Sequence, residues 1–118
     1  MESTTAAAAL SALAHEGRLE IFRLLVQAGP EGLAAGQIAR ATDARPNTLS
    51  ANLNILSHAG LATSRREGRS IIYTAGFGRM RELLAYLMED CCAGKAEICG
   101  PLAEVVSRCC AAETATAC

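Results

Sequence analysis

Aromatic residues are almost absent from this chain of 118 residues: phenylalanine and tyrosine together make up 3% of it, and tryptophan does not occur. The core must therefore be built from leucine, isoleucine, valine and alanine, in a chain that is 51% hydrophobic. No apolar run reaches the roughly eighteen residues of a membrane span, and the alanine-rich start has no basic leader typical of a secretory signal. We expect one compact domain in the cytoplasm, with no membrane partner.

Cysteine is missing from the first 90 residues, and all six cysteines fall within the last 28. A disulfide framework normally spreads its anchors along a chain, so this distribution favours ligands or redox groups. Cys91 and Cys92 are followed after six residues by Cys99, and a turn after Ala93-Gly94 would let the three thiols converge. Thiolates select soft or borderline ions, so we predict a site for a thiophilic metal or metalloid. Auxiliary or inert roles are expected for three cysteines in the Ala/Thr-rich tail: Cys109, Cys110 and Cys118.

The net charge of −1 argues against a protein that coats nucleic acid generally, but the charge is unevenly distributed. Residues 1–80 hold eight arginines against six acidic residues, a surplus of +2, whereas residues 81–118 carry −3. The positive surplus therefore lies in the part of the chain that carries the candidate DNA-binding segments.

Apolar spacing and glycine and proline stops predict five helices, over residues 4–14, 17–28, 34–42, 46–60 and 78–91. In the fourth helix, Leu49, Leu53 and Leu56 fall within a narrow arc and should face the core. The second helix crowds apolar residues onto one side: Leu19, Ile21, Phe22, Leu24 and Leu25. The last helix carries more apolar surface than a monomer would leave in water: Met80, Leu83, Leu84, Leu87 and Met88.

The outer side of the fourth helix is uncharged and rich in amide and hydroxyl groups. Asn52 lies nearer to the buried edge. His58 is expected to be a surface residue or a backbone contact at the helix end, and His15 a cap or a satisfied residue at the junction of the first two helices. Amides can pair with adenine edges and hydroxyls with several bases or phosphates, so we predict that this helix reads the major groove. The predicted contacts are Arg45, Asn47, Thr48, Ser50, Ala51 and Asn54.

Residues 61–74 are typical of two strands joined at a glycine-containing turn, with three arginines at its tip: Arg65, Arg66 and Arg69. These arginines would grip phosphates without reading sequence. A hairpin directly after a helix-turn-helix predicts a mostly α fold with a β-hairpin wing. We expect a winged helix-turn-helix domain over residues 1–92 and a cysteine-bearing tail over residues 93–118.

Three segments resemble the ArsR/SmtB family of metalloregulatory repressors. Residues 13–25 (LAHEGRLEIFRLL) are similar to its opening, residues 47–61 (NTLSANLNILSHAGL) to its recognition helix and residues 65–69 (RREGR) to its wing. The resemblance covers about residues 8–92. It implies a homodimeric repressor, paired through the first and last helices, that leaves its operator when a metal or metalloid binds. Two recognition helices one DNA turn apart would read an inverted repeat in that operator.

One departure from the family concerns the position of the sulfur ligands. Many arsenic-sensing members carry paired cysteines on the third helix, but residues 34–40 of this chain contain none. Another branch places a vicinal pair just after the last helix with a third cysteine beyond, which Cys91, Cys92 and Cys99 resemble. A structural zinc site has four ligands, whereas three thiolates suit trivalent arsenic or antimony. The expected inducer is therefore As(III) or Sb(III), and no organic cofactor is expected.

Two other functions remain open at this stage. A thiol-redox regulator would join the vicinal cysteines in a disulfide, although Glu89 and Asp90 beside them disfavour the thiolates that it needs. A zinc-bearing interaction module would carry stoichiometric zinc and require it to fold. A cysteine-dependent enzyme is not expected, because no histidine lies near the cysteines in sequence and no glycine-rich phosphate loop occurs.

Overall fold

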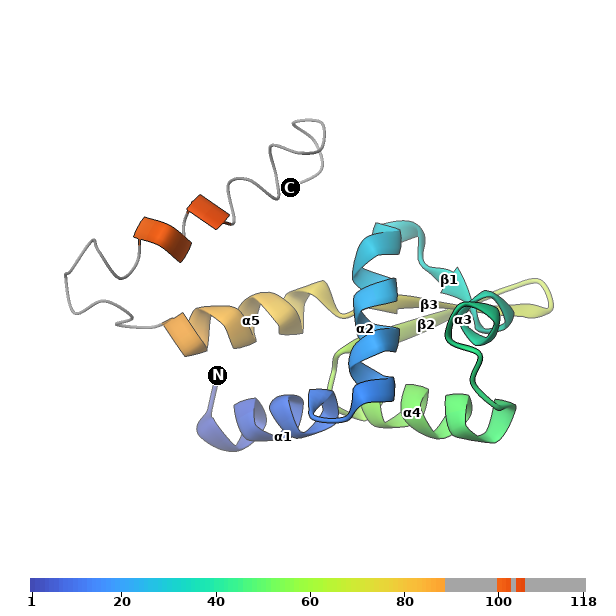
Figure 1. The fold of residues 1–118 in the computed structure, drawn as a ribbon, viewed down its shortest axis with the longest axis horizontal. Helices are drawn as coiled ribbons and strands as arrows, with labels where there is room; N and C mark the ends of the chain where they lie inside the picture. The colour runs from blue at the N-terminus through green and yellow to red at the C-terminus, as the bar shows by residue number, and fades with distance from the viewer. Residues whose placement is uncertain (89–99, 103, 106–118) are drawn as a thin grey trace. The chain divides into compact units, whose positions relative to one another are not determined.

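The computed structural model describes residues 1–88, 100–102, 104 and 105 (Figure 1). Residues Met1–Tyr86 form one compact unit, and the described residues from Leu87 onward do not belong to it. The predicted boundary between residues 92 and 93 falls outside the described residues. The elements in chain order are α1 (Ser3–Leu13), α2 (Glu16–Ala28), the 3-10 helix η1 (Gly29–Glu31), β1 (Leu33–Ala34), α3 (Ala35–Thr42), α4 (Pro46–His58), β2 (Ala62–Glu67), β3 (Ser70–Ala75) and α5 (Phe77–Met88).

All five predicted helices are present, and their described ends lie within two residues of the prediction. The helix α2 begins at Glu16, one residue before the predicted start, because His15 caps it: the ring nitrogen Nδ1 accepts a hydrogen bond of 3.1 Å from the amide of Gly17. It ends at Gly29, whose φ of 73° suits glycine and breaks the helical backbone. The predicted last residues of α5, 89–91, lie outside the described residues.

The sheet has three strands, whereas the sequence predicted only a two-stranded hairpin. The additional strand β1 pairs antiparallel with β3, with Leu33 opposite Tyr73 and Ala34 opposite Ile72, so the strand order is β1-β3-β2. A strand of two residues is too short to show the alternation by which strands are recognised. The sequence therefore carries no signal for β1, whereas the predicted stop at Gly29-Pro30 coincides with the start of η1.

The core lies around α2, which crosses in front of the sheet and packs against α1, α3, α4 and β3 (Figure 1). The predicted inward residues of α4, Leu49, Leu53 and Leu56, are all buried, so that prediction is confirmed. The largest fully buried side chains are aliphatic, as the scarcity of aromatic residues requires: Ile21, Leu25, Ile38, Leu56 and Leu61.

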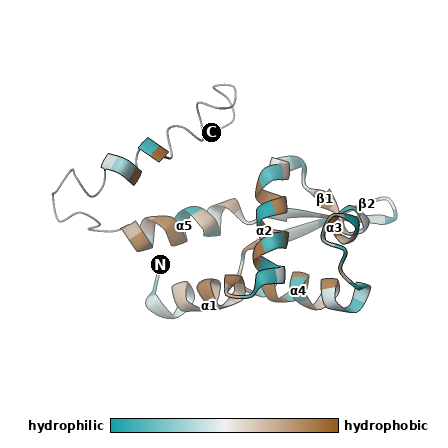
Figure 2. Cartoon of the chain, viewed as in Figure 1, coloured by the Kyte–Doolittle hydropathy of each residue, from teal (hydrophilic) through white to brown (hydrophobic). Residues whose placement is uncertain are grey.

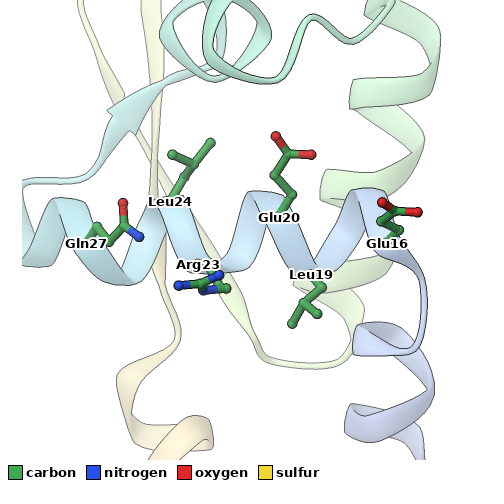
Figure 3. Close-up of a pocket in the computed structure, with 6 residues that line it drawn as sticks. All are labelled: Glu16, Leu19, Glu20, Arg23, Leu24 and Gln27. Carbon is green, nitrogen blue, oxygen red and sulfur yellow. The ribbon is translucent and has the colours of Figure 1, made fainter.

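The prediction that Leu19 joins the buried side of α2 is wrong, because 44% of its surface is exposed. Leu19 precedes the buried Ile21 by two residues, which on a helix separates them by about 200°. It lies instead along the outer side of α2, where it helps to line a hollow of about 340 Å³ (Figure 3). All six lining residues belong to α2, so no second element closes this hollow: Glu16, Leu19, Glu20, Arg23, Leu24 and Gln27.

The helix α5 turns Leu83 into the core and leaves much of its remaining apolar surface exposed. Figure 2 shows that the last turns of α5 are largely hydrophobic. The exposed fractions are 53% for Leu84, 50% for Leu87 and 37% for Met88, and Leu10 on α1 is 42% exposed. The hydroxyl groups of Ser3 on α1 and Tyr86 on α5 lie 2.6 Å apart and form a hydrogen bond. In the described part of the chain, no helix has both the length and the apolar character needed to cross a bilayer.

Candidate nucleic-acid interface

A three-residue turn, Asp43 to Arg45, joins α3 to α4 and sets the direction of the candidate recognition helix. Asp43 ends α3 in the left-handed conformation with a φ of 54°, and Arg45 is extended with a ψ of 147°. Proline at the first position of α4 has a backbone already suited to a helix and needs no amide partner there. The two helices and their short turn form a helix-turn-helix.

The predicted reading face of α4 is exposed along its length. Leu49, Leu53 and Leu56 anchor the opposite side in the core, which fixes the rotation of the helix about its axis. Amide and hydroxyl groups are therefore presented outward at helical spacing. The first turn of α4 is hydrophilic (Figure 2). The exposed residues are Asn47, Thr48, Ser50, Ala51 and Asn54, together with Arg45 just before the helix.

The minor predictions for α4 and its neighbours also match the structure. Among the described residues, Asn52 is the buried polar residue, with 6% of its surface exposed, and it lies against the start of α2, where its amide nitrogen is close to Gly17. His58 is exposed at the helix end. It borders a hollow of about 450 Å³ between α1 and α4, beside Arg18, which donates a 2.6 Å hydrogen bond to the carbonyl of Ala12.

The wing is the hairpin of β2 and β3, which turns through Gly68 and Arg69 alone. Gly68 has a φ of 61°, as two-residue hairpin turns demand. Arg66 is paired with Ile71, one position inside the closing pair of Glu67 and Ser70. Arg66 and Arg69 are both exposed, so two cations project at or beside the end of the wing.

Arg65 does not lie at the tip, and this part of the predicted geometry is wrong. It belongs to β2, opposite Ile72, and its guanidinium group is bonded within the chain. Its two terminal nitrogens donate to the Thr74 hydroxyl at 3.2 Å and to the Glu31 carbonyl at 2.8 Å, and its Nε is 3.5 Å from a Glu67 carboxylate oxygen. Sequence reasoning missed Glu31 and Thr74 because they lie 34 and 9 residues from Arg65 along the chain.

The end of α4 and the start of α5 meet at a close backbone contact. The amide of Gly76 donates a 2.8 Å hydrogen bond to the carbonyl of Leu61, and Gly76 lies so close to Gly60 that a Cβ at Gly76 would clash with the Gly60 carbonyl. Gly60 has a φ of 78° and packs beneath the side chain of Arg79. This contact joins the start of α5 to the residues that follow α4.

The predicted sulfur ligands Cys91, Cys92 and Cys99 lie outside the described residues, as do Cys109, Cys110 and Cys118. Within the residues that the structure describes, no group of three His, Cys, Asp or Glu side chains is arranged to hold a metal ion. The described residues provide three features: the polar face of α4, the arginine-bearing hairpin that packs against α4 through β2, and the junction with α5 at the base of that hairpin.

Residues 13–65 match the sequence profile of a helix-turn-helix domain. The chain is 32% identical over 91 residues to the biofilm growth-associated repressor of Agrobacterium fabrum, and the match covers 77% of this chain and 75% of that protein.

Two solved structures extend the comparison to the fold. A homodimeric winged helix-turn-helix DNA-binding domain from Mycobacterium bovis, described as a possible ArsR-family transcriptional regulator, is 35% identical with a TM-score of 0.60, covering 74% of this chain and 80% of that one. Reduced HlyU from Vibrio cholerae is 31% identical with a TM-score of 0.58, covering 72% of this chain and 90% of that one. The predicted fold class is thereby confirmed.

Proposed function

The chain belongs to the ArsR family of winged helix-turn-helix transcriptional regulators, which are DNA-binding proteins and not enzymes, and we propose that it is a repressor released from its operator by a thiol-binding ion. The DNA-binding part of this proposal rests on the exposed amide and hydroxyl face of α4, which packs against strand β2 of the wing. Asn47, Ser50 and Asn54 would read base edges in the major groove, while Thr48 and Ala51 pack along the groove wall. Arg45, Arg66 and Arg69 would neutralise phosphates.

The repressor acts as a homodimer on an inverted repeat. Leu10 on α1 and Leu84 on α5 are 42% and 53% exposed, and such apolar surface on two helices favours a second copy. The related domain from Mycobacterium bovis is itself a homodimer. To fit two half-sites, the two α4 helices of the dimer would have to lie about one helical turn of DNA apart, roughly 34 Å.

The inducer is arsenite or antimonite, bound by Cys91, Cys92 and Cys99. Cys91 follows Met88, the last described residue of α5, by three positions. Three soft thiolates suit a trivalent metalloid whose lone pair leaves a pyramidal site, and no fourth donor is required. Cys109, Cys110 and Cys118 are auxiliary at most. No organic cofactor takes part.

Ion binding acts on DNA through α5. A site just beyond this helix would bias its direction, and the Gly60–Gly76 contact passes that change to the end of α4. The two recognition helices then lose the spacing that fits successive major grooves. To reverse occupancy from 99:1 to 1:99, the ion must favour the released state by about 5.5 kcal/mol.

A thiol-redox switch is the second candidate, because the related HlyU of Vibrio cholerae has been solved in a form described as reduced. Here an oxidant such as a peroxide would take two electrons from Cys91 and Cys92, and the two thiols would close a disulfide. The same helix α5 would carry the signal.

A titration of the operator-bound dimer separates these inducers. Arsenite, antimonite, zinc, cadmium and hydrogen peroxide are added in turn, with and without a reductant that does not bind the ions, and release of labelled operator is followed by fluorescence anisotropy. The proposal expects release by arsenite and antimonite under reducing conditions. Release by peroxide alone would replace it with the redox switch, and stoichiometric zinc needed for folding would replace it with a zinc-bearing module.

A further inference from the structure

We propose that Arg65 is the residue that positions the wing against the helix-turn-helix unit, rather than a third contact to phosphate. This inference rests on the proposed function, since it concerns how the wing is presented to DNA. It makes Arg65 a positioning residue that acts through Arg66 and Arg69.

The side chain of Arg65 spans the width of the sheet. Arg65 lies opposite Ile72 on the neighbouring strand, so Thr74, two residues further along β3, shares its side of the sheet. The guanidinium passes Thr74 and reaches the carbonyl of Glu31, which lies just before β1 at the opposite edge from β2. Neighbouring strands are about 4.8 Å apart, so the arginine side chain and the 2.8 Å hydrogen bond at its end together bridge two spacings.

The carbonyl of Glu31 is held within reach by the residue that follows it. Gly32 has a φ of 73°, and a Cβ at this position would clash with the Tyr73 carbonyl and come within 2.8 Å of the Thr74 hydroxyl oxygen. Only glycine lets the chain approach β3 so closely with this backbone conformation. Two separate features, the Gly32 approach and the Arg65 bridge, therefore fasten the same turn to the same strand.

That turn leads directly into the helix-turn-helix. Glu31 ends η1, and the two residues of β1 separate Gly32 from the first residue of α3. Fastening the turn to β2 and β3 thus fixes the hairpin relative to α3, and through the short turn to α4. The wing and the recognition helix then reach DNA in a set relation.

The chemistry of Arg65 suits this bridge. Its planar guanidinium directs several donors at once, and three nitrogens are directed at Thr74, Glu31 and Glu67. The carboxylate of Glu67 also offsets its charge. Lysine would keep the charge but has a single nitrogen, which cannot hold acceptors spread across two strands and a turn.

The test compares Arg65→Lys and Arg65→Ala in the full-length dimer, each in the wild-type background and in an Arg66→Ala/Arg69→Ala background. Affinity for a palindromic operator is measured against salt concentration. A bridge predicts that Arg65→Lys and Arg65→Ala weaken binding alike, by roughly fivefold, the worth of one net hydrogen bond. It further predicts that the loss falls below about twofold once Arg66 and Arg69 are gone, since the wing then has little left to position.

Thr74→Val provides a probe that changes no charge, and it should weaken binding in the wild-type background only. Thermal melting of each variant confirms that the fold is kept. If Arg65→Lys binds like wild type, or if the Arg65→Ala loss is unchanged in the doubly substituted background, Arg65 contacts phosphate directly and this inference is overturned. If the Arg66→Ala/Arg69→Ala protein binds as tightly as wild type, the wing contact in the proposed function is wrong and the inference falls with it.

Discussion

The backbone of Gly76, the residue before α5, lies against the backbone of Gly60, two residues after α4 ends, with no room for a side chain between them. This contact joins the helix that leads toward the cysteines to the helix that presents the DNA-reading face. A rigid backbone junction transmits a change in direction better than a flexible linker would, because it cannot absorb the change locally.

Substituting Gly76 should damage this junction. In Gly76→Ala the added methyl group meets the Gly60 carbonyl, and overpacking of this kind costs about 1–3 kcal/mol of unfolding free energy. Gly78→Ala is the matched control, since nothing lies within 4 Å of its Cβ position, and it should leave stability unchanged or raise it by up to about 1 kcal/mol. Urea denaturation measures both, and equal losses in the two variants would count against the close contact.

Substitutions on the outer face of α4 should erode sequence preference. Asn47→Ala or Ser50→Ala removes a base contact, so affinity for the operator should fall by about 1–3 kcal/mol per contact while binding to unrelated DNA changes little. Competition binding with operator and scrambled DNA measures the ratio. Gln27→Ala, on the outer side of α2, is the control. A uniform loss on both DNAs would mean that α4 does not read bases.

The wing arginines should act on all DNA sequences alike. Arg66→Ala and Arg69→Ala should each reduce the slope of log affinity against log salt by about 0.9, the value for one phosphate contact. Arg23→Ala, which removes an exposed arginine from the outer side of α2, should leave the slope unchanged. Two wing variants with the wild-type slope would show that the hairpin does not touch the DNA backbone.

The exposed apolar residues of α5 should hold the dimer together. Leu84→Glu places a charge where half of a leucine side chain is exposed, so burial against a second copy becomes unfavourable and the protein should sediment as a monomer at micromolar concentration. Leu19→Glu makes the same change at a residue of similar exposure on α2 and should remain dimeric. Dissociation of the Leu19 variant alone would move the interface to α2.

The sequence predicted α4 and its orientation because two independent signals agree there. Pro46 marks the first turn, and the spacing of Leu49, Leu53 and Leu56 assigns the buried side, which leaves the polar side to DNA. Predictions failed where the decisive contacts are distant along the chain. The place of β1 depends on pairing with Tyr73 and Ile72, and the role of Arg65 depends on a carbonyl 34 residues away.

The predicted side of α2 is also wrong for one residue, Leu19, which is 44% exposed. The sequence pattern predicts Leu19 on the same side of α2 as Ile21 and Leu25, but the helical rotation between them carries Leu19 to the exposed side. The angle between residues around the helix axis predicts the buried side, whereas the number of apolar residues in the segment does not. The helix α2 has more apolar residues than its buried side can hold.

The central claim is that a metalloid bound at Cys91, Cys92 and Cys99 releases the operator, and anisotropy of labelled operator during arsenite addition tests it most directly. Cys91→Ser and Cys92→Ser should bind operator like wild type and fail to release it, while Cys99→Ser should respond weakly to arsenite and retain a response to methylarsenite, which needs two thiolates. The triple variant Cys109→Ser, Cys110→Ser and Cys118→Ser should release operator normally. Loss of release in this triple variant, with release kept in Cys91→Ser and Cys92→Ser, would contradict the account.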